Sequence, residues 1–224
     1  MTTTDPKEAL LDAALLHVVF DGWSEATFDA AIADTDIDPA LARALCPRGA
    51  VDLAVAYHKR GDAEMLARFH EEDLGTLRYS EKVAALVRFR LEAAEDKEAV
   101  RRGSTLFSLP QYAATGAQLI WYTCDAIWNA LGDTSDDVNW YTKRMTLSAV
   151  YGSTVLYWLG DESEGHEATW AFLDRRIENV MQFEKAKAQF RKSPLGKLAE
   201  GPLGLLGRIK APTARTNMPG QWKS

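Results

Sequence analysis

Hydrophobic residues recur at helical spacing along most of the chain, and no segment shows the alternation that marks a half-buried strand. In residues 5–20 they form one stripe. Further along the chain, comparable stripes or residues typical of helix starts and ends follow. The pattern predicts an all-α protein with helices over about 5–20, 25–34, 39–46, 50–70, 81–95, 97–108, 110–131, 138–159 and 165–192.

Local start and stop signals support these boundaries. Asp5 before Pro6 is typical of a helix start, since an aspartate caps the free amides and proline fits the first turn. Gly22 is expected to end that helix. Ser24 and Ser80 are predicted caps of later helices, and Pro110 is expected to start the helix that ends at Leu131.

The stretch 121–157 organises the chain. Two apolar segments are joined by a short acidic turn, in which Gly132 suits the closing residue of the first helix and residues 135–137 suit the cap of the second. The second segment is apolar most of the way round after Arg144, so it is predicted to be buried inside a domain. Its small pairs, Ser148/Gly152 and Ala149/Ser153, predict either close packing of a neighbouring helix or a cavity for an apolar ligand.

Composition narrows the class of protein. The chain has 224 residues, is 46% hydrophobic and contains seven Trp, which is enough for a full hydrophobic core. Its two Cys, Cys46 and Cys124, lie far apart in apolar contexts, so we expect buried, reduced thiols and a reducing compartment. No secretory signal and no run of about 18 apolar residues is visible, so no membrane span is predicted.

Charge is distributed unevenly. From Phe183 onward, nine Lys/Arg stand against two Glu, whereas residues 1–182 hold 17 Lys/Arg against 30 Asp/Glu. Basic residues interleaved with Leu and Ile predict a segment that lies on an anionic membrane surface. A flexible basic tail, or a helix docked on the acidic body, is the alternative. The predicted membrane-binding residues are Lys192, Leu195, Lys197, Leu198, Leu203, Leu206, Arg208 and Ile209.

No constellation of catalytic residues stands out. The four His show no metal-binding spacing, and neither a phosphate-binding glycine loop nor a nucleophile motif is present. The carboxylates of residues 133–137 have no basic or metal partner nearby in the sequence, and helix capping explains part of that cluster. We therefore expect no catalytic residues, no metal and no cofactor.

The first 60 residues resemble the helix-turn-helix head of TetR-type regulators, with a long helix, a glycine turn, two short helices and a linker helix. They hold ten Asp/Glu against five Lys/Arg, and the third helix, near Asp36 and Asp38, offers Arg43 as its one cation. Because DNA binding depends on neutralising phosphates, such a head is expected to act as a scaffold that binds no nucleic acid. The predicted regions are a head over 1–50, a helical ligand-binding domain over 51–192 and a basic arm over 193–224.

One motif is far more specific. The run G-D-T-S-D-D-V-N-W-Y-T-K-R at residues 132–144, followed by A-V-Y-x-S-T and W-A-F-L-D-R-R-I, resembles the accessory proteins of ubiquinone biosynthesis that form the ninth coenzyme Q protein family. The resemblance covers about residues 8–185 and is strongest over 121–181. That family has a TetR-like fold with a divergent, non-regulatory head.

The resemblance implies a homodimer that is not an enzyme and that holds an isoprenoid lipid in its helical C-terminal domain. It implies presentation of quinone intermediates to the di-iron demethoxyubiquinone hydroxylase, from a peripheral position on the cytoplasmic side of a bacterial inner membrane. A TetR-type, ligand-responsive transcription regulator is the alternative function. Matched by position, the partner-binding residues are Ser135, Asp137, Asn139, Trp140 and Tyr141.

The lining of the implied lipid cavity is a separate hypothesis that rests on apolarity and position alone. It comprises residues on and near the two central helices that are large and apolar. These candidates are Leu109, Trp121, Ile127, Trp128, Met145, Tyr151 and Val155.

Overall fold

The computed structural model describes residues 5–94, 96–192 and 210, and the described residues form helices and connecting turns without a strand. This confirms the all-α prediction. The elements are α1 (Pro6–Asp21), α2 (Glu25–Ala33), α3 (Pro39–Leu45), α4 (Ala50–Glu71), α5 (Tyr79–Glu92), α6 (Lys97–Ser108), α7 (Ala113–Ala130), α8 (Val138–Gly160), the short 3-10 helix η1 (Glu164–His166) and α9 (Glu167–Lys192).

Several helix ends form as their capping residues predict. The Asp5 carboxylate accepts a hydrogen bond from the amide of Lys7 at 3.0 Å, and Gly22 closes the helix with φ of 67°. Asp137 caps α8 by accepting from the amide of Asn139 at 2.8 Å. These ends could be predicted because each depends on residues adjacent in the sequence.

Two predicted starts are wrong. α5 begins at Tyr79, two residues earlier than a Ser80 cap predicts, because Glu81 accepts a hydrogen bond from the Arg78 amide at 2.8 Å and caps the helix from within. α7 begins at Ala113 rather than at Pro110, since residues 109–112 form a turn closed by the bond from the Tyr112 amide to the Leu109 carbonyl.

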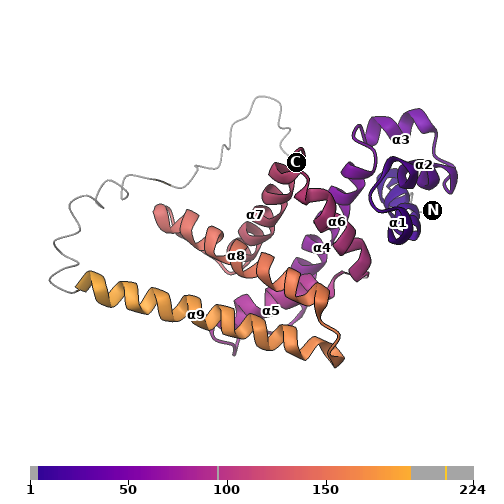
Figure 1. Cartoon of the computed structure of the whole chain (residues 1–224). Coiled ribbons are helices and arrows are strands. Elements are labelled where there is room, and N and C mark those ends of the chain that lie inside the picture. The colour runs from indigo at the N-terminus through magenta and orange to yellow at the C-terminus, as the bar shows by residue number, and fades with distance from the viewer. Residues whose placement is uncertain (1–4, 95, 193–209, 211–224) are drawn as a thin grey trace.

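The N-terminal helices form one end of the molecule. In Figure 1, α1, α2 and α3 cluster beside the first half of α4. Their core includes Leu10, Phe28 and Leu53 and is completed from α6 by Ala99, which accepts a hydrogen bond from Trp23. The predicted head therefore has a core of its own, although α4 and α6 contribute to it.

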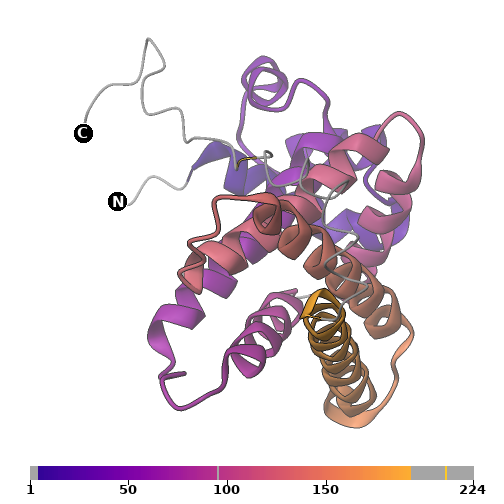
Figure 2. The same ribbon diagram turned by 90° about the vertical axis from the view of Figure 1, so that its left-hand side faces the viewer.

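A second core lies between α4, α5, α7, α8 and α9. It contains Met65, Leu86, Ile127, Leu147 and Leu173, among other buried residues. α8 and α9 contact each other and run in opposite directions, joined at η1, and Figure 2 shows α9 nearly end-on beside α5 and α8. α4 links both cores, because its first half packs on α1 and its second half on α5 and α7.

The prediction that α8 is buried nearly all round is wrong. Leu147, Val150 and Trp158 are buried, but Met145 is 63% and Leu156 is 69% exposed. α8 contacts α7, α9 and α6, and these neighbours leave part of its circumference open. One face of an apolar helix therefore remains uncovered in the described chain.

Within the described ranges, no helix is both long enough and apolar enough to cross a membrane. Most of the predicted membrane-binding arm, residues 193–209, lies outside those ranges, as does the side chain of Lys192. The arm and the proposed division at residues 50 and 192 stay predictions.

Candidate functional site

A cavity of about 430 Å³ lies between α4, the end of α5, α6, α7 and α8. Most of its wall is apolar, and Trp23 from the α1–α2 turn closes part of it. A volume of this size is typical of small-molecule sites, whose walls are largely hydrophobic with a few polar groups. The apolar lining includes Ala54, Leu91, Val100, Phe107, Leu119, Ile120, Val155 and Trp158.

Glycines contribute to the space. Gly152 on α8 lines the cavity, and a Cβ built there would meet no atom within 4 Å. Gly116 on α7 also lines it but touches Phe107, where a Cβ would lie 2.7 Å from the Phe107 Cβ. Of the two explanations for the small residues of α8, the geometry at Gly152 therefore favours a cavity over close helix packing.

One end of the cavity is polar. Arg90 is buried and its Nε donates to Asp62 at 2.6 Å, while Nη2 donates to the carbonyl oxygen of His58 at 2.8 Å. Thr123 donates to the same Asp62 oxygen at 2.8 Å and lies 2.9 Å from Nε2 of His58. Burial and the charge of Arg90 lower the pKa of His58 to about 3, so its imidazole is neutral near pH 7 and the local charges are those of Arg90 and Asp62.

A charged residue of an amphipathic helix is expected on the solvated face, but Arg90 is buried. Arg90 follows Leu86 by four residues and Val87 by three, so it belongs to the apolar stripe that faces the core. This helical spacing was the feature of the sequence that indicated burial of Arg90. The partners that make burial of its charge possible, on α4 and α7, could not be identified from the sequence of α5.

The structure separates the predicted lipid-binding residues. Tyr151 and Val155 line the large cavity. Trp128 lines a second one of about 260 Å³ between α5, α8 and α9, and Ile127 is buried in the core beside it. Leu109 and Met145 are largely exposed and Trp121 packs against Trp140, and none of these three lines either cavity.

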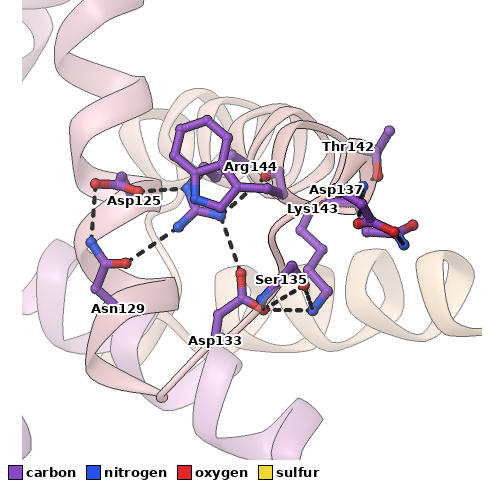
Figure 3. A network of polar contacts seen from close by, with 10 residues as sticks. Asp125, Asn129, Asp133, Ser135, Asp137, Thr142, Lys143 and Arg144 are labelled. Atoms are coloured by element: carbon purple, nitrogen blue, oxygen red, sulfur yellow. Dashed lines mark hydrogen bonds and ion pairs between the residues drawn. The ribbon is translucent and has the colours of Figure 1, made fainter. Parts of the chain in front are cut away.

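The turn between α7 and α8 is built around a buried cation. The Arg144 side chain is fully buried, and its Nε donates to Asp125 at 2.5 Å. Nη1 donates to Asp133 at 3.2 Å and to the carbonyl oxygen of Trp140 at 3.1 Å. Nη2 donates to Asn129 at 3.3 Å. Figure 3 shows these carboxylate and amide groups converging on Arg144 from α7 and the turn.

Asp133 is also held by Lys143 at 2.7 Å and by the hydroxyl of Ser135 at 2.8 Å. Its burial alone would raise its pKa, but the hydrogen bonds from Lys143, Ser135 and Arg144 lower that pKa to about 2. The expectation that the acidic turn lacks a basic partner is therefore wrong for Asp133. Lys143 and Arg144 follow it by 10 and 11 residues and reach back because α8 folds over the turn.

The aromatic residues of the motif form a cluster on this network. The Trp140 ring centroid lies 5.8 Å from Trp121 and 4.8 Å from Tyr141, and the Arg144 guanidinium stacks 4.0 Å above the Trp140 ring. Trp140 and Tyr141 are each partly buried, whereas Asn139 is exposed. Both rings therefore cover the end of the α7–α8 pair while keeping an accessible edge.

The other predicted partner-binding residues have structural contacts. Ser135 is half-buried and bonded to Asp133 and Lys143, and Asp137 caps α8. The structure thus brings all five predicted residues together on one turn. It adds Arg144, which the sequence reasoning did not single out, as the residue that holds the turn in place.

Part of the chain matches a known protein family. Residues 113–184, which span α7, α8 and most of α9, match the family model described as COQ9. The chain is 29% identical over 185 residues to "Ubiquinone biosynthesis protein COQ9, mitochondrial" of Drosophila melanogaster, covering 80% of this chain and 56% of that protein. It is 35% identical over 109 residues to the rat protein of that name (Rattus norvegicus), covering 49% and 35%.

"Probable ubiquinone biosynthesis protein coq9, mitochondrial" of Dictyostelium discoideum is 27% identical over 190 residues, covering 81% of this chain and 61% of that protein. The chain thus spans about half the length of the curated relatives it matches. The resemblance predicted from the motif at residues 132–144 is confirmed.

The fold has a known counterpart. The crystal structure of the TetR transcriptional regulator from Nitrosomonas europaea ATCC 19718 superimposes with a TM-score of 0.65 at 22% identity, covering 80% of this chain and 99% of that chain. This confirms the predicted TetR-like arrangement of helices. At this identity the likeness concerns the fold alone.

Proposed function

We propose that this protein is a non-catalytic accessory protein of ubiquinone biosynthesis that binds an isoprenoid quinone intermediate in the cavity between α4 and α8. The observation that carries the proposal is the apolar cavity of about 430 Å³, to which the family-matching helices α7 and α8 contribute part of the wall. The curated relatives are named for ubiquinone biosynthesis, a pathway whose intermediates carry long apolar tails.

The fold likeness also raises the alternative of a transcription regulator. The charges of the head speak against it. Arg43, the cation of α3, is ion-paired with Glu25 and lies 3.8 Å from Asp29, so its charge is already compensated within the head. A recognition helix whose cation is already ion-paired contributes little to neutralising the phosphates of a DNA backbone.

Filling the cavity tests the proposal. Gly152→Leu places a side chain where a Cβ meets no atom within 4 Å, so α8 should keep its fold and gain helix propensity. The added group competes with the ligand at a cost of about 1–3 kcal/mol, or roughly 5- to 150-fold in affinity. We expect purified Gly152→Leu protein to carry correspondingly less isoprenoid lipid, measured by lipid mass spectrometry per mole of protein.

Gly160→Leu is the matched control. It lies at the exposed end of the same helix, where a Cβ also meets no atom within 4 Å, and it does not line the cavity. Its lipid content should equal that of the wild type. Absence of isoprenoid lipid from the wild type, or equal content in both variants, would contradict a ligand in this cavity.

We further propose that the α7–α8 turn is the surface that receives the di-iron hydroxylase of the pathway. The partly exposed aromatic pair Trp140 and Tyr141, held from below by buried Arg144, has the character of an interface anchor: rigid, aromatic and already ordered. Presentation at a membrane by the basic arm, and a homodimeric assembly, complete the proposal and rest on the sequence and the family resemblance.

Removing an anchor should weaken the complex without unfolding the chain. Trp140→Ala or Tyr141→Ala is expected to cost about 2 kcal/mol of binding, roughly thirtyfold in Kd, measured by biolayer interferometry against the purified hydroxylase. Tyr157→Ala serves as the control, because Tyr157 is an exposed aromatic on the same helix that stacks on Phe172 instead. If folded Trp140 and Tyr141 variants bind like the wild type, these rings only cover the core.

A further inference from the structure

Two hydrogen-bond donors that belong to buried residues of the cavity lining have no protein acceptor within the described part of the chain. Arg90 uses Nε and Nη2 for Asp62 and the His58 carbonyl, but its Nη1 makes no hydrogen bond there. The hydroxyl of Tyr151 on α8 makes none either. Arg90 is 6% and Tyr151 is 3% exposed. A donor on a cavity wall that has no protein acceptor is available to a ligand or to an ordered water.

The direction of the Arg90 guanidinium is set by its surroundings. Asp62 and the His58 carbonyl hold two of its nitrogens, and Nη1 lies against Gly61 of α4. A Cβ at residue 61 would be 2.5 Å from Nη1, so the guanidinium can occupy this place only because the backbone there is bare. The donor is therefore preorganised at the cavity wall.

The charges at this end suit a neutral acceptor. Asp62 already compensates Arg90, and the His58 imidazole is neutral near pH 7. Burial raises the pKa of Tyr151 to about 12, with the charge of nearby Arg90 opposing the rise, so the phenol keeps its proton and can donate it. Arg90 and Tyr151 offer donors and no acceptor to a ligand cation, and a ligand anion would add an uncompensated charge to a buried site.

We propose that Arg90 and Tyr151 form a head-group subsite that donates hydrogen bonds to a ring oxygen of the ligand, a quinone carbonyl or the corresponding phenol oxygen. The ring then lies at the polar end formed by α4, α5 and α8, and the apolar tail occupies the rest of the cavity along residues such as Val100, Phe107 and Val155. This assignment rests on the proposed function and specifies which end of the ligand the protein recognises.

Tyr151→Phe tests the subsite, because it removes the hydroxyl and leaves the ring. Three probes with ten-carbon chains are compared by displacement of a fluorescent apolar dye: an alkylated methoxy-1,4-benzoquinone, the corresponding alkylbenzene and decanoic acid. We expect the variant to bind the quinone about fivefold more weakly and to bind the alkylbenzene as the wild type does. Tyr157→Phe, outside the cavity on the same helix, should change neither affinity.

The outcomes separate the subsite from the proposed function. Unchanged quinone affinity in Tyr151→Phe, or an equal loss for quinone and alkylbenzene, overturns the subsite while an apolar ligand site stands. A loss confined to decanoic acid shows a carboxylate site and overturns the assignment to a ring oxygen. If the wild type binds none of the three probes, the proposed function fails together with the subsite.

Discussion

Replacing Arg144 by methionine is expected to lower the free energy of unfolding by about 3–5 kcal/mol, because it removes one partner of a buried ion-pair network. The Arg144 side chain is fully buried between Asp125 and Asp133, and Asp133 is itself 1% exposed at its side chain. Methionine fills similar space but leaves these carboxylates without the guanidinium. The Trp140 carbonyl oxygen and ring lose the same partner.

Urea denaturation followed by circular dichroism measures this change. Arg78→Met is the control, since Arg78 pairs with Glu81 on the surface with 80% of its side chain exposed, and such pairs contribute about 0–1 kcal/mol. A loss for Arg144→Met no larger than that of the control would mean that the network does not hold the turn. Because Arg144 supports Trp140, the same variant should also bind the hydroxylase more weakly at temperatures where it remains folded.

The second large effect concerns pH. The pKa of His58 in the fold is about 3, below its ordinary value near 6.5, because burial and the Arg90 charge disfavour the imidazolium. Between these two values the unfolded chain binds a proton that the folded chain excludes. Stability from this group is therefore present above pH 6.5 and falls by up to about 1.4 kcal/mol per pH unit as the pH drops toward 3.

Measuring the free energy of unfolding from pH 7 to pH 4.5 tests this sign and size. His58→Asn keeps a polar group beside Thr123 but removes the titration, so the decline with falling pH should be shallower than in the wild type. His70→Asn, at the exposed end of α4, should follow the wild-type curve. The measured interval, pH 7 to pH 4.5, lies above the pH at which Asp133 of the folded chain, with a pKa of about 2, becomes protonated. Identical slopes for wild type and His58→Asn would contradict a neutral buried His58.

Local signals in the sequence predicted the helices well. Asp5 with Pro6, Gly22, the helix start at residue 39, and the span 97–108 all appear as expected, because capping and glycine turns depend on neighbours within a few residues. Where a competing local contact existed, the prediction failed: Glu81 caps α5 from inside the helix, so the start moved away from Ser80.

The motif at residues 132–144 predicted the resemblance to the family model described as COQ9 and the position of the aromatic turn, and the sequence alone was sufficient for both. Neither the role of Arg144 nor the pairing of Asp133 could be read from it. A carboxylate just after the end of α7 and a cation in the second turn of α8 become partners only when the two helices fold back on each other.

The sequence by itself therefore determined the helices, most of their ends, the family motif and the acidic head, since each depends on residue type and short-range spacing. The tertiary structure decided which apolar residues line a cavity and which are exposed. Val155 and Met145 are both apolar residues of α8, but one faces the cavity beside α4 and α6 and the other is exposed. It also decided that Arg90 is buried, because the charge is stable there only with Asp62, Gly61 and the His58 carbonyl of α4 around it.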